Sequence, residues 1–168
     1  HGVPFSDEEL KTLWKHQKDP IVEMLLIMYY SGFRISAYKK MDVDLKERYF
    51  QGGIKSKAGR NRVVPIHPCI YDIVKARCKR YGSLLGTSAS AFRKDMYEVL
   101  ERLGIEKHTP HDCRHTFSSL CERYCVNEND RKRMLGHSFG NDITNGVYGH
   151  RTIEDLRAEI KKIPSPHL

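Results

Sequence analysis

The sequence predicts an α+β fold class: a mainly helical domain that carries one small antiparallel β-sheet or hairpin. Over most of the 168 positions, apolar residues recur at helical spacing behind good N-cap residues. One stretch near residue 55 instead has strand-like texture around a tight-turn signal. No internal repeat, low-complexity tract or long linker divides the chain, so we expect a single domain over residues 1–168.

The first helix is predicted from "FSDEEL". Ser6 can cap it, and Glu9 stands three residues later, where its side chain can bond back to the cap. A second helix is predicted from Asp19, because Pro20 suits the first helical position. Gly32 should end that helix, and the following "RISAYKKM" is typical of a short further helix.

The second predicted helix carries an apolar stripe at spacing i, i+3, i+4 and i+7, formed by Ile21, Met24, Leu25 and Met28. A stripe of this spacing is far more typical of a face packed on the core than of a binding surface.

Between Arg48 and Ile66 the pattern changes. "YFQGGIKSK" and "RNRVVPI" predict two strands, and Ala58-Gly59 between them predicts a tight turn.

Helical texture returns after the predicted strands. The expected spans are Pro68 to Tyr81, Ser88 to Leu103, Pro110 to Tyr124, Asn129 to Leu135 and Ile153 to Ile163. Thr152 and Asp155 can cap the last of these helices, and Pro164 should stop it.

The composition favours a polyanionic partner. Lys and Arg number 29 against 21 Asp and Glu, which gives a net charge of +8 and a pI near 9.3. Five cysteines without paired CxxC spacing are typical of reduced thiols. "IVEMLLIMYY" is the longest apolar run, and it is too short for a membrane span and contains Glu23.

The stretch "HTPHDCRHTF", His108 to Phe117, concentrates reactive side chains at a predicted helix start. Thr109 is a good N-cap and Pro110 a good first residue, with an aspartate three positions past the cap. His111 and Arg114 then share one face of the first turn, where free backbone N–H groups and the helix dipole favour an anion. The pattern indicates a phosphate-binding site, and the alternative is an ordinary exposed helix start.

A metal site is a weaker interpretation of the same stretch. His111, Cys113 and His115 cannot converge on one ion, because residues two apart point to different sides of a helix. No Glu follows His111 as in the HExxH zinc motif. Cys121 and Cys125 could add ligands, but packed helix positions explain them as well.

Two further stretches complete a pattern. "SGFRIS" places Arg34 just after a glycine that ends a helix, and "MLGHSFGNDITNGVYGH" places His137 just past Gly136. Tyr148 follows eleven residues later. Taken singly, these are compatible with a surface ion pair, a loop histidine and a core aromatic residue.

Taken in order, these residues resemble the tyrosine recombinase (phage integrase) family, and the resemblance covers nearly the whole chain. The motif residues that match the family's catalytic set are, in chain order, Arg34, Lys57, His111, Arg114, His137 and Tyr148. The "RHTF" and "LGHS" boxes are typical of the family, and an ordered R…K…HxxR…LGH…Y series is much more specific than any one member.

The chain departs from the family's pattern in three places. Ala37 stands where the family usually has an acidic residue that supports the active-site loop. The gap between His137 and Tyr148 is slightly longer than usual. Lys55 and Arg60 flank the predicted turn, so Lys57 is the best of three candidates for the family's hairpin lysine.

The resemblance implies DNA strand cleavage and rejoining through a 3′-phosphotyrosyl intermediate, without metal, cofactor or ATP. Tyr148 would be the nucleophile, Lys57 the general acid, and Arg34 and Arg114 a clamp on the phosphate. His137 would donate a further hydrogen bond to the phosphate. His111 is the implied proton acceptor or positioner, and His115 is expected to be structural.

This chemistry is expected to serve site-specific recombination, as in the integration and excision of a mobile element. A type IB topoisomerase-like enzyme would share the cleavage step without strand exchange. A DNA-binding regulator that has lost catalysis is a third alternative, but such a protein would be expected to lack Arg34, Arg114 or Tyr148, and all three are present.

The resemblance also implies partners and context. The family normally carries core-binding and arm-binding domains before the catalytic domain, and we expect those parts to be absent from this chain. Double-stranded DNA and other recombinase subunits in a tetrameric synapse are the implied partners. The implied location is the cytoplasm, in association with the nucleoid, for a protein encoded by a bacterium or a phage. Candidate grips on the DNA backbone are Lys39, Lys40, Lys75, Arg77, Lys79, Arg80 and Arg131 to Arg133.

The apolar stripe of the last predicted helix needs a cover. Its members are Ile153, Leu156, Ile160 and Ile163. The resemblance implies docking onto a neighbouring subunit, and burial against the same chain is the simpler alternative.

Overall fold

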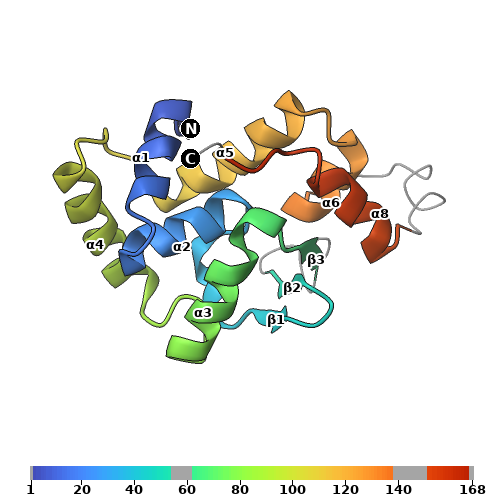
Figure 1. Cartoon of the computed structure of the whole chain (residues 1–168), viewed down its shortest axis with the longest axis horizontal. Coiled ribbons are helices and arrows are strands. Elements are labelled where there is room, and N and C mark those ends of the chain that lie inside the picture. Colours follow the sequence, from blue (N-terminus) through green and yellow to red (C-terminus); the bar gives the residue numbers. More distant parts are fainter. Residues whose placement is uncertain (1, 54–61, 138–150, 167–168) are drawn as a thin grey trace.

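The computed structural model describes residues 2–53, 62–137 and 151–166 (Figure 1). Its helices and strands, in chain order, are α1 (Asp7–Lys15), α2 (Pro20–Tyr29), the 3-10 helix η1 (Ile35–Lys39), β1 (Asp42–Asp44), β2 (Tyr49–Gly52), β3 (Arg62–Pro65), the 3-10 helix η2 (Pro68–Ile70), α3 (Tyr71–Tyr81), α4 (Ala89–Arg102), α5 (Pro110–Arg123), α6 (Glu128–Leu135) and α8 (Ile153–Ile160). In these ranges no helix combines the length and the apolar character that crossing a bilayer needs.

Helix α2 is the centre of the fold. It packs against α1, α3, α4 and α5, which surround it in Figure 1. Every residue from Val22 to Tyr29 is buried, so the helix is enclosed on all sides rather than along one stripe. A helix that is apolar all round needs such an enclosure.

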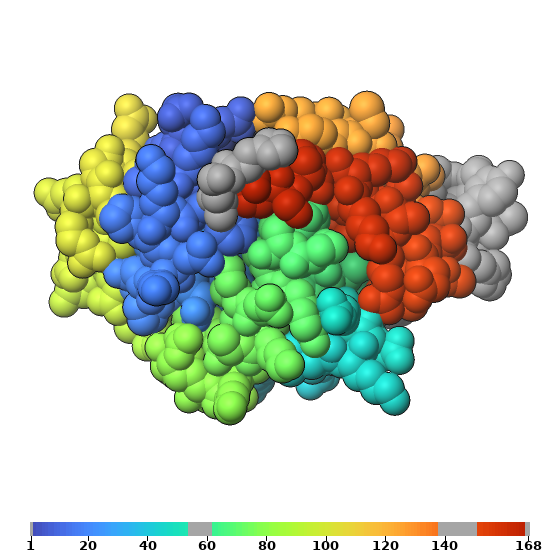
Figure 2. Space-filling view, in the orientation of Figure 1, coloured from blue at the N-terminus to red at the C-terminus, as the bar shows by residue number. Residues whose placement is uncertain are grey.

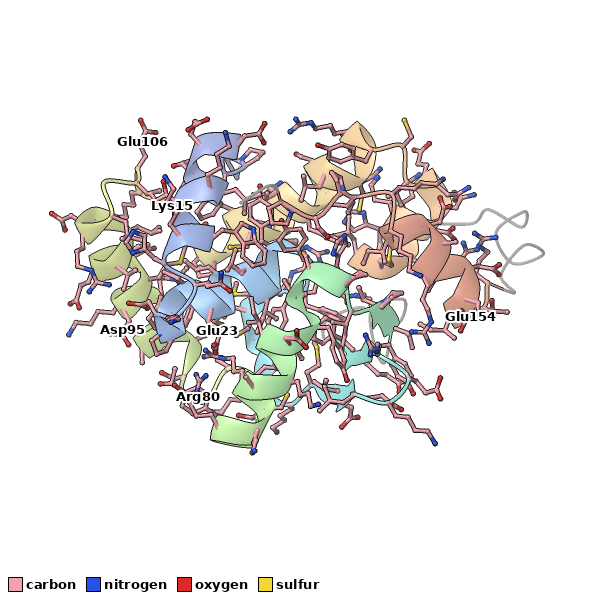
Figure 3. The ribbon with its side chains drawn as sticks, viewed as in Figure 1. Lys15, Glu23, Arg80, Asp95, Glu106 and Glu154 are labelled. Atoms are coloured by element: carbon pink, nitrogen blue, oxygen red, sulfur yellow. The ribbon has the colours of Figure 1, made fainter. Side chains whose placement is uncertain are left out.

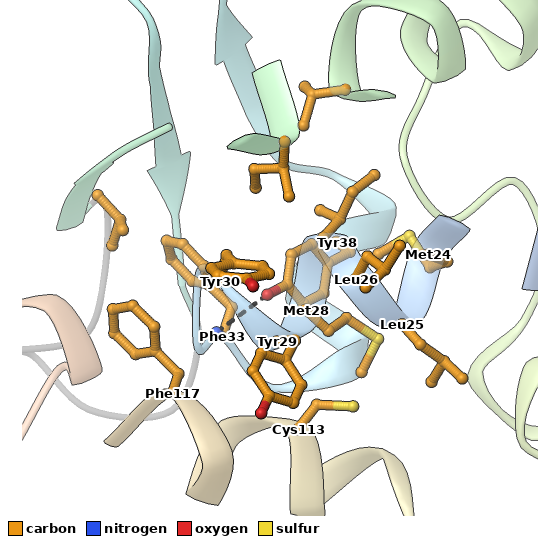
Figure 4. Packing of buried hydrophobic residues seen from close by; sticks show 14 of the residues in the cluster. Met24, Leu25, Leu26, Met28, Tyr29, Tyr30, Phe33, Tyr38, Cys113 and Phe117 are labelled. Atoms are coloured by element: carbon orange, nitrogen blue, oxygen red, sulfur yellow. Dashed lines mark hydrogen bonds between the residues drawn. The ribbon is translucent and has the colours of Figure 1, made fainter. Parts of the chain in front are cut away.

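The turn that follows α2 is locked by aromatic side chains (Figure 4). The Tyr38 hydroxyl accepts a hydrogen bond from the Phe33 N–H at 3.1 Å and lies 2.6 Å from the Ser31 hydroxyl. Gly32 has φ +76°, and a Cβ there would overlap the Phe117 ring. Only glycine fits this close approach of the turn to α5, which fixes the backbone two residues before Arg34.

The three strands form one antiparallel sheet in the order β1-β2-β3. Phe50 of β2 pairs with Val64 of β3, and both side chains are buried. The two predicted strands are confirmed, although the predicted turn at Ala58-Gly59 lies outside the described residues. β1 was not predicted, because Asp-Val-Asp is too short and too acidic to indicate a strand.

The predicted helix starts at α1, α5 and α8 are confirmed. Ser6 and Glu9 form the capping box of α1, and Thr152 and Asp155 form that of α8. The Thr109 N–H donates to the Asp112 carboxylate at the start of α5. These signals are local in sequence, so they could be identified without tertiary information.

The C-terminal helix lies against its own chain. Leu156, Ile160 and Ile163 are buried, and α8 packs against β3. Figure 2 shows the red C-terminal residues adjoining the orange of α6 and the green of α3. The two alternatives for this stripe were burial against the same chain and docking onto a neighbouring subunit. The structure has the stripe buried against the same chain.

Arg77, one of the candidate grips on the DNA backbone, serves the fold instead. The Arg77 side chain is buried and donates to Glu23 at 2.9 Å and to the Pro20 carbonyl at 2.7 Å. Arg80 donates to both carboxylate oxygens of Glu23 from the half-exposed side (Figure 3). The prediction was wrong for Arg77, because a charge run on a helix does not reveal which member faces inward.

Replacing Arg77 by methionine is expected to lower the free energy of unfolding by about 3 kcal/mol, because buried Glu23 keeps only the half-exposed Arg80 and the Pro20 carbonyl loses its donor. Urea unfolding measures the loss. Arg80→Met is the matched control and should cost much less, since its guanidinium is half exposed and solvent replaces it. Equal losses for the two variants would contradict the structural role of Arg77.

A buried histidine ties down the end of α8. His67 Nδ1 accepts from the Cys69 N–H at 3.1 Å, so the ring proton sits on Nε2, which donates to the Ile163 carbonyl at 2.6 Å. Burial lowers the pKa of His67 below its ordinary value, because the charged ring would lose its hydration.

The lowered pKa of His67 predicts a loss of stability in acid. The unfolded chain binds the proton more readily, so this contribution is complete above about pH 6.5 and declines as the pH falls toward the folded pKa. His67→Gln keeps a donor for Ile163 but does not titrate. Urea unfolding between pH 5 and 7 should show that the free energy of unfolding falls less steeply with decreasing pH in the variant than in the wild type. Equal slopes for the two proteins would rule out His67 as the source of the acid sensitivity.

Candidate active site

Arg114 is the structural centre of the site. It lies in the second turn of α5, with only 5% of its surface exposed. Its Nη1 donates to the Gly32 carbonyl at 2.7 Å and its Nη2 to the Leu135 carbonyl at 2.6 Å. One guanidinium thus joins the end of α2, the start of α5 and the end of α6. A guanidinium has five N–H donors, so up to three remain for a ligand.

Arg34 enters the site from the turn after α2. It is the N-cap residue of η1 and is half-buried. The rigid turn described above places its side chain beside Arg114. Burial lowers the pKa of Arg114 to about 10, and the positive charges of Arg34 and Arg62 add to this effect. Among the residues that the structure describes, no carboxylate pairs with Arg34 or Arg114, and two such neighbouring guanidiniums are suited to bind an anion.

His111 lies in the first turn of α5, and its ring meets the His115 ring edge to face at 4.8 Å. Burial, His115 and the two arginines lower the pKa of His111, so its imidazole is neutral near pH 7. A neutral imidazole can accept a proton. His115 thus lies on the rim of the same site, where we had expected a purely structural residue.

His137 follows the end of α6. Gly136 adopts the left-handed conformation that closes the helix, and the His137 N–H bonds back to the Lys132 carbonyl at 2.9 Å. Burial and the nearby arginines lower the pKa of His137 as well. The Leu135 carbonyl held by Arg114 lies two residues before it, so the arginine also fixes the approach of this histidine.

These side chains line one small pocket, which we call the arginine pocket. Its volume is about 130 Å³, and its lining residues are Arg34, His111, Arg114, His115, Ser118, Leu135 and His137. The volume is well below the roughly 300–1,000 Å³ of typical small-molecule sites. A phosphoryl group therefore suits the arginine pocket better than a whole nucleotide.

A second hollow opens from the arginine pocket. Its volume is about 470 Å³, and it shares Arg34 and His111 while adding Arg93 and the N-terminus of α5. No Asp or Glu lines either hollow among the described residues. A positive, acid-free surface that widens from a small pocket fits one reacting phosphate with further phosphates beyond it.

A larger hollow, about 600 Å³, lies where α1, α2 and α3 meet. It contains none of the predicted site residues. Its basic residues are accompanied by Asp19, Glu23 and Asp72, and Arg102 bonds Asp19 at 2.7 Å. Because these carboxylates offset most of the positive charge, size alone does not make this hollow the better candidate for a polyanion.

Arg62 is a residue of the site that sequence reasoning missed. It is buried at the start of β3, its guanidinium lies 4.4 Å from the centroid of the Phe33 ring, and its Nε donates to the Met134 carbonyl at 2.9 Å. Its charge contributes to the lowered pKa of Arg114 and of His137. The available signal was strand alternation in "RNRVVPI", which places Arg62 and Val64 on the same face.

Two predicted site residues lie outside the described residues. They are Lys57 and Tyr148, and the alternative lysine and arginine, Lys55 and Arg60, lie outside them as well. Of the predicted site residues within the described ranges, the structure brings together Arg34, His111, Arg114 and His137. Ala37, at the position where an acid was expected, is buried in the core.

The other members of "HTPHDCRHTF" face away from the arginine pocket. His108 is buried against the Phe5 ring at 3.9 Å and bonds Asp112 at 2.8 Å and Glu9 at 3.0 Å, which ties the N-terminal segment to α5. Cys113 is fully buried in the core beside Tyr29 (Figure 4). The cysteine is thus a packed residue, as the alternative to a metal site had it.

Solved structures share this architecture. A crystal structure of XerA recombinase superposes with a TM-score of 0.68 and 22% identity, covering 93% of this chain and 62% of that one. The integrase from mycobacterium phage Brujita gives a TM-score of 0.73 at 15% identity, over 98% of this chain and 59% of that one. The Tn1549 transposon integrase in complex with transposon right end DNA gives 0.63 at 18% identity, over 96% and 66%. At these identities the likeness establishes the fold.

Curated relatives are similar in sequence as well. The tyrosine recombinase XerA of Thermococcus kodakarensis is 30% identical over 156 residues, which cover 83% of this chain and 54% of the relative. XerA of Thermococcus onnurineus is 29% identical over the same shares. The chain spans about half the length of these relatives. The sequence pattern described as "Phage integrase family" matches residues 5–154, so the chain belongs to the phage integrase family.

Proposed function

We propose that this chain is the catalytic domain of a site-specific DNA recombinase that cleaves and rejoins strands through a 3′-phosphotyrosyl intermediate. The observation that carries the proposal is the arginine pocket, where two arginines converge with the neutral His111 and His137 and where no acidic side chain of the described part of the chain takes part. Membership of the family, and the integrase of similar fold that is bound to transposon DNA, support DNA as the polyanion.

The proposed reaction is a transesterification at a DNA phosphodiester. The Tyr148 oxygen attacks phosphorus, the bond to the 5′-oxygen breaks, and the tyrosine becomes joined to the 3′-phosphate. The attacking hydroxyl loses a proton and the leaving 5′-oxygen gains one, which we assign to Lys57 as general acid. Attack by the 5′-hydroxyl of a second strand reverses the step, so rejoining needs no ATP.

The residues that the structure describes would stabilise the negative charge on the phosphate and accept the proton of the tyrosine. Arg34 and Arg114 would donate to the non-bridging oxygens, on which charge grows in the transition state. His137 would donate a further hydrogen bond there. His111 is the proposed acceptor of the tyrosine proton, since the surrounding positive charge and burial keep it neutral. Fixed cations of this kind can take the role that Mg²⁺ has in other phosphoryl-transfer sites, so no metal is proposed.

The proposed partners are duplex DNA and further recombinase subunits. Strand exchange needs cleavage of two duplexes in one assembly, and we propose a tetrameric synapse on DNA. Because α8 is covered by its own chain here, a segment docking between subunits would have to leave β3 first. Mobile-element integration and excision are the uses that fit this chemistry best.

The tyrosine assignment predicts a covalent adduct. On a nicked duplex that carries the recombination site, cleavage releases a short strand and traps the full-length protein on DNA, visible on denaturing gels. EDTA should not change the yield. Tyr148→Phe removes only the attacking oxygen, so it should abolish the adduct and leave DNA affinity nearly intact.

Three outcomes would contradict this assignment. An adduct that survives Tyr148→Phe would identify another nucleophile, and a requirement for Mg²⁺ would remove the mechanism. Relaxation of supercoiled DNA without exchange between two sites would favour the topoisomerase-like alternative.

Replacing Arg34 by lysine should slow adduct formation by about 100–1,000-fold, because lysine keeps the charge but loses the planar fork. Arg34 is half-buried and caps a short helix without a side-chain hydrogen bond, so the melting temperature should change little. Arg93→Lys, in the adjoining hollow, is the matched control and should leave the rate within a few-fold of wild type. Equal effects of the two changes would argue against a phosphate clamp at Arg34.

A further inference from the structure

Asp130 of α6 is a buried carboxylate whose partners are both arginines. Its side chain has 0% exposed surface. One oxygen accepts from Arg133 at 2.9 Å, and Arg151 forks onto both oxygens at 2.9 and 2.6 Å. Neither the proposed reaction nor the family pattern described above uses this triad.

The location of the triad connects it to the arginine pocket. Asp130 and His137 are seven residues apart, about 10 Å along the helix direction. Arg151 is the first described residue after the segment that contains Tyr148, three positions beyond that tyrosine. His137, which directly precedes this segment, follows the end of α6. Arg151, which directly follows the segment, is held to the same helix by Asp130.

Arg151 is also joined rigidly to the rest of the C-terminal helix. Thr152, its neighbour, caps α8 through reciprocal bonds with Asp155. Farther along α8, Glu159 accepts from the Asn127 N–H at 2.6 Å, which ties α8 to the start of α6. α8 cannot shift along α6 without breaking these bonds, so Arg151 is a fixed anchor.

The chemistry of the triad favours a positioning role over a purely stabilising one. Removing a carboxylate from water is costly, and a buried ion pair adds little net stability compared with apolar packing. A two-pronged arginine–carboxylate contact does fix both distance and orientation. An exposed lysine would fix neither the distance nor the orientation of the chain as closely, because its ammonium group is a point charge on a flexible side chain.

We propose that Asp130 and Arg151 are positioning residues that hold the chain beyond Tyr148, so that the tyrosine is delivered to the phosphate in the arginine pocket. The inference rests on the proposed function, because it assigns the nucleophile to Tyr148. A three-residue connection spans at most about 11 Å, so a loosened anchor widens the range of positions open to the tyrosine. Misplacement by about 1 Å can slow a reaction about 100-fold.

The test separates placement of the tyrosine from the phosphate pocket itself. In the first assay, single-turnover adduct formation is measured with saturating full-length protein on the nicked duplex. In the second, Tyr148→Phe protein is given hydrogen peroxide, a small nucleophile that attacks the phosphate without any tyrosine. Strand scission in the second assay depends on the arginine pocket and on the general acid assigned to Lys57, but not on the position of the tyrosine.

Asp130→Asn removes the charge with little change in shape. It should slow adduct formation by about 10–100-fold. In the Tyr148→Phe background it should change peroxide cleavage less than about threefold, and DNA affinity should be unaltered. Arg151→Lys, which keeps one donor, should fall between wild type and Arg151→Gln in the first assay.

Arg157→Gln is the matched control on the same helix, since Arg157 pairs with the exposed Glu154 in the first turn of α8, which is labelled in Figure 3. It should leave both rates near wild type. Thermal unfolding of each variant shows whether it is folded at the assay temperature. Should Asp130→Asn not be folded, Arg151→Lys decides the matter, because its side chain is 34% exposed and solvent can replace the lost bond.

Equal slowing in both assays would overturn the inference, since the triad would then maintain the pocket rather than the tyrosine. An unchanged rate of adduct formation in folded Asp130→Asn and Arg151→Gln proteins would also overturn it. A failure of the proposed function has a different signature: wild-type protein forms no adduct, or the adduct persists in Tyr148→Phe.

Discussion

The site depends on one buried guanidinium. Arg114 donates to the carbonyls of Gly32 and Leu135, which belong to the ends of α2 and α6. Gly32 lies in the turn after α2 and Leu135 is the last residue of α6, and they precede the pocket residues Arg34 and His137 by two positions each. Because a guanidinium is planar and its donors are fixed in direction, its two bonds set the relative placement of three chain segments. The arginine that would bind phosphate is also the one that assembles the pocket.

This arrangement concentrates positive charge, and within the described ranges no acidic side chain lines the pocket to neutralise it. Burial and mutual repulsion lower the pKa of Arg114 to about 10 and the pKa of Arg62 to about 10, and the same causes act on His111 and His137. A bound phosphate would oppose each of these effects, since an anion stabilises every neighbouring cation. The repulsion between these cations therefore favours an anion in the pocket, and it helps to keep His111 and His137 neutral near pH 7.

Local sequence determined most of the secondary structure. The helix starts at Ser6, Thr109 and Thr152 depend on bonds that span three residues, and the strands of β2 and β3 follow from composition and alternation. Burial could not be obtained in this way. The enclosure of α2 on all sides and the inward direction of Arg77 depend on helices that pack from distant parts of the chain. A local sequence pattern indicates how side chains are spaced along a helix or strand, but it does not indicate which distant segments will pack against them.

For the site, the sequence by itself determined the identity and order of the candidate residues, because an ordered series of motifs is specific even when each member is not. It assigned Arg34, His111, Arg114 and His137 to one phosphate site, and the tertiary structure brings these four together. Only the tertiary structure decided the contacts that hold them. Arg114 reaches a carbonyl 82 positions earlier in the chain, and Asp130 reaches Arg151 across 21. Such contacts depend on how whole helices pack, and no spacing rule within a short window of sequence can encode them.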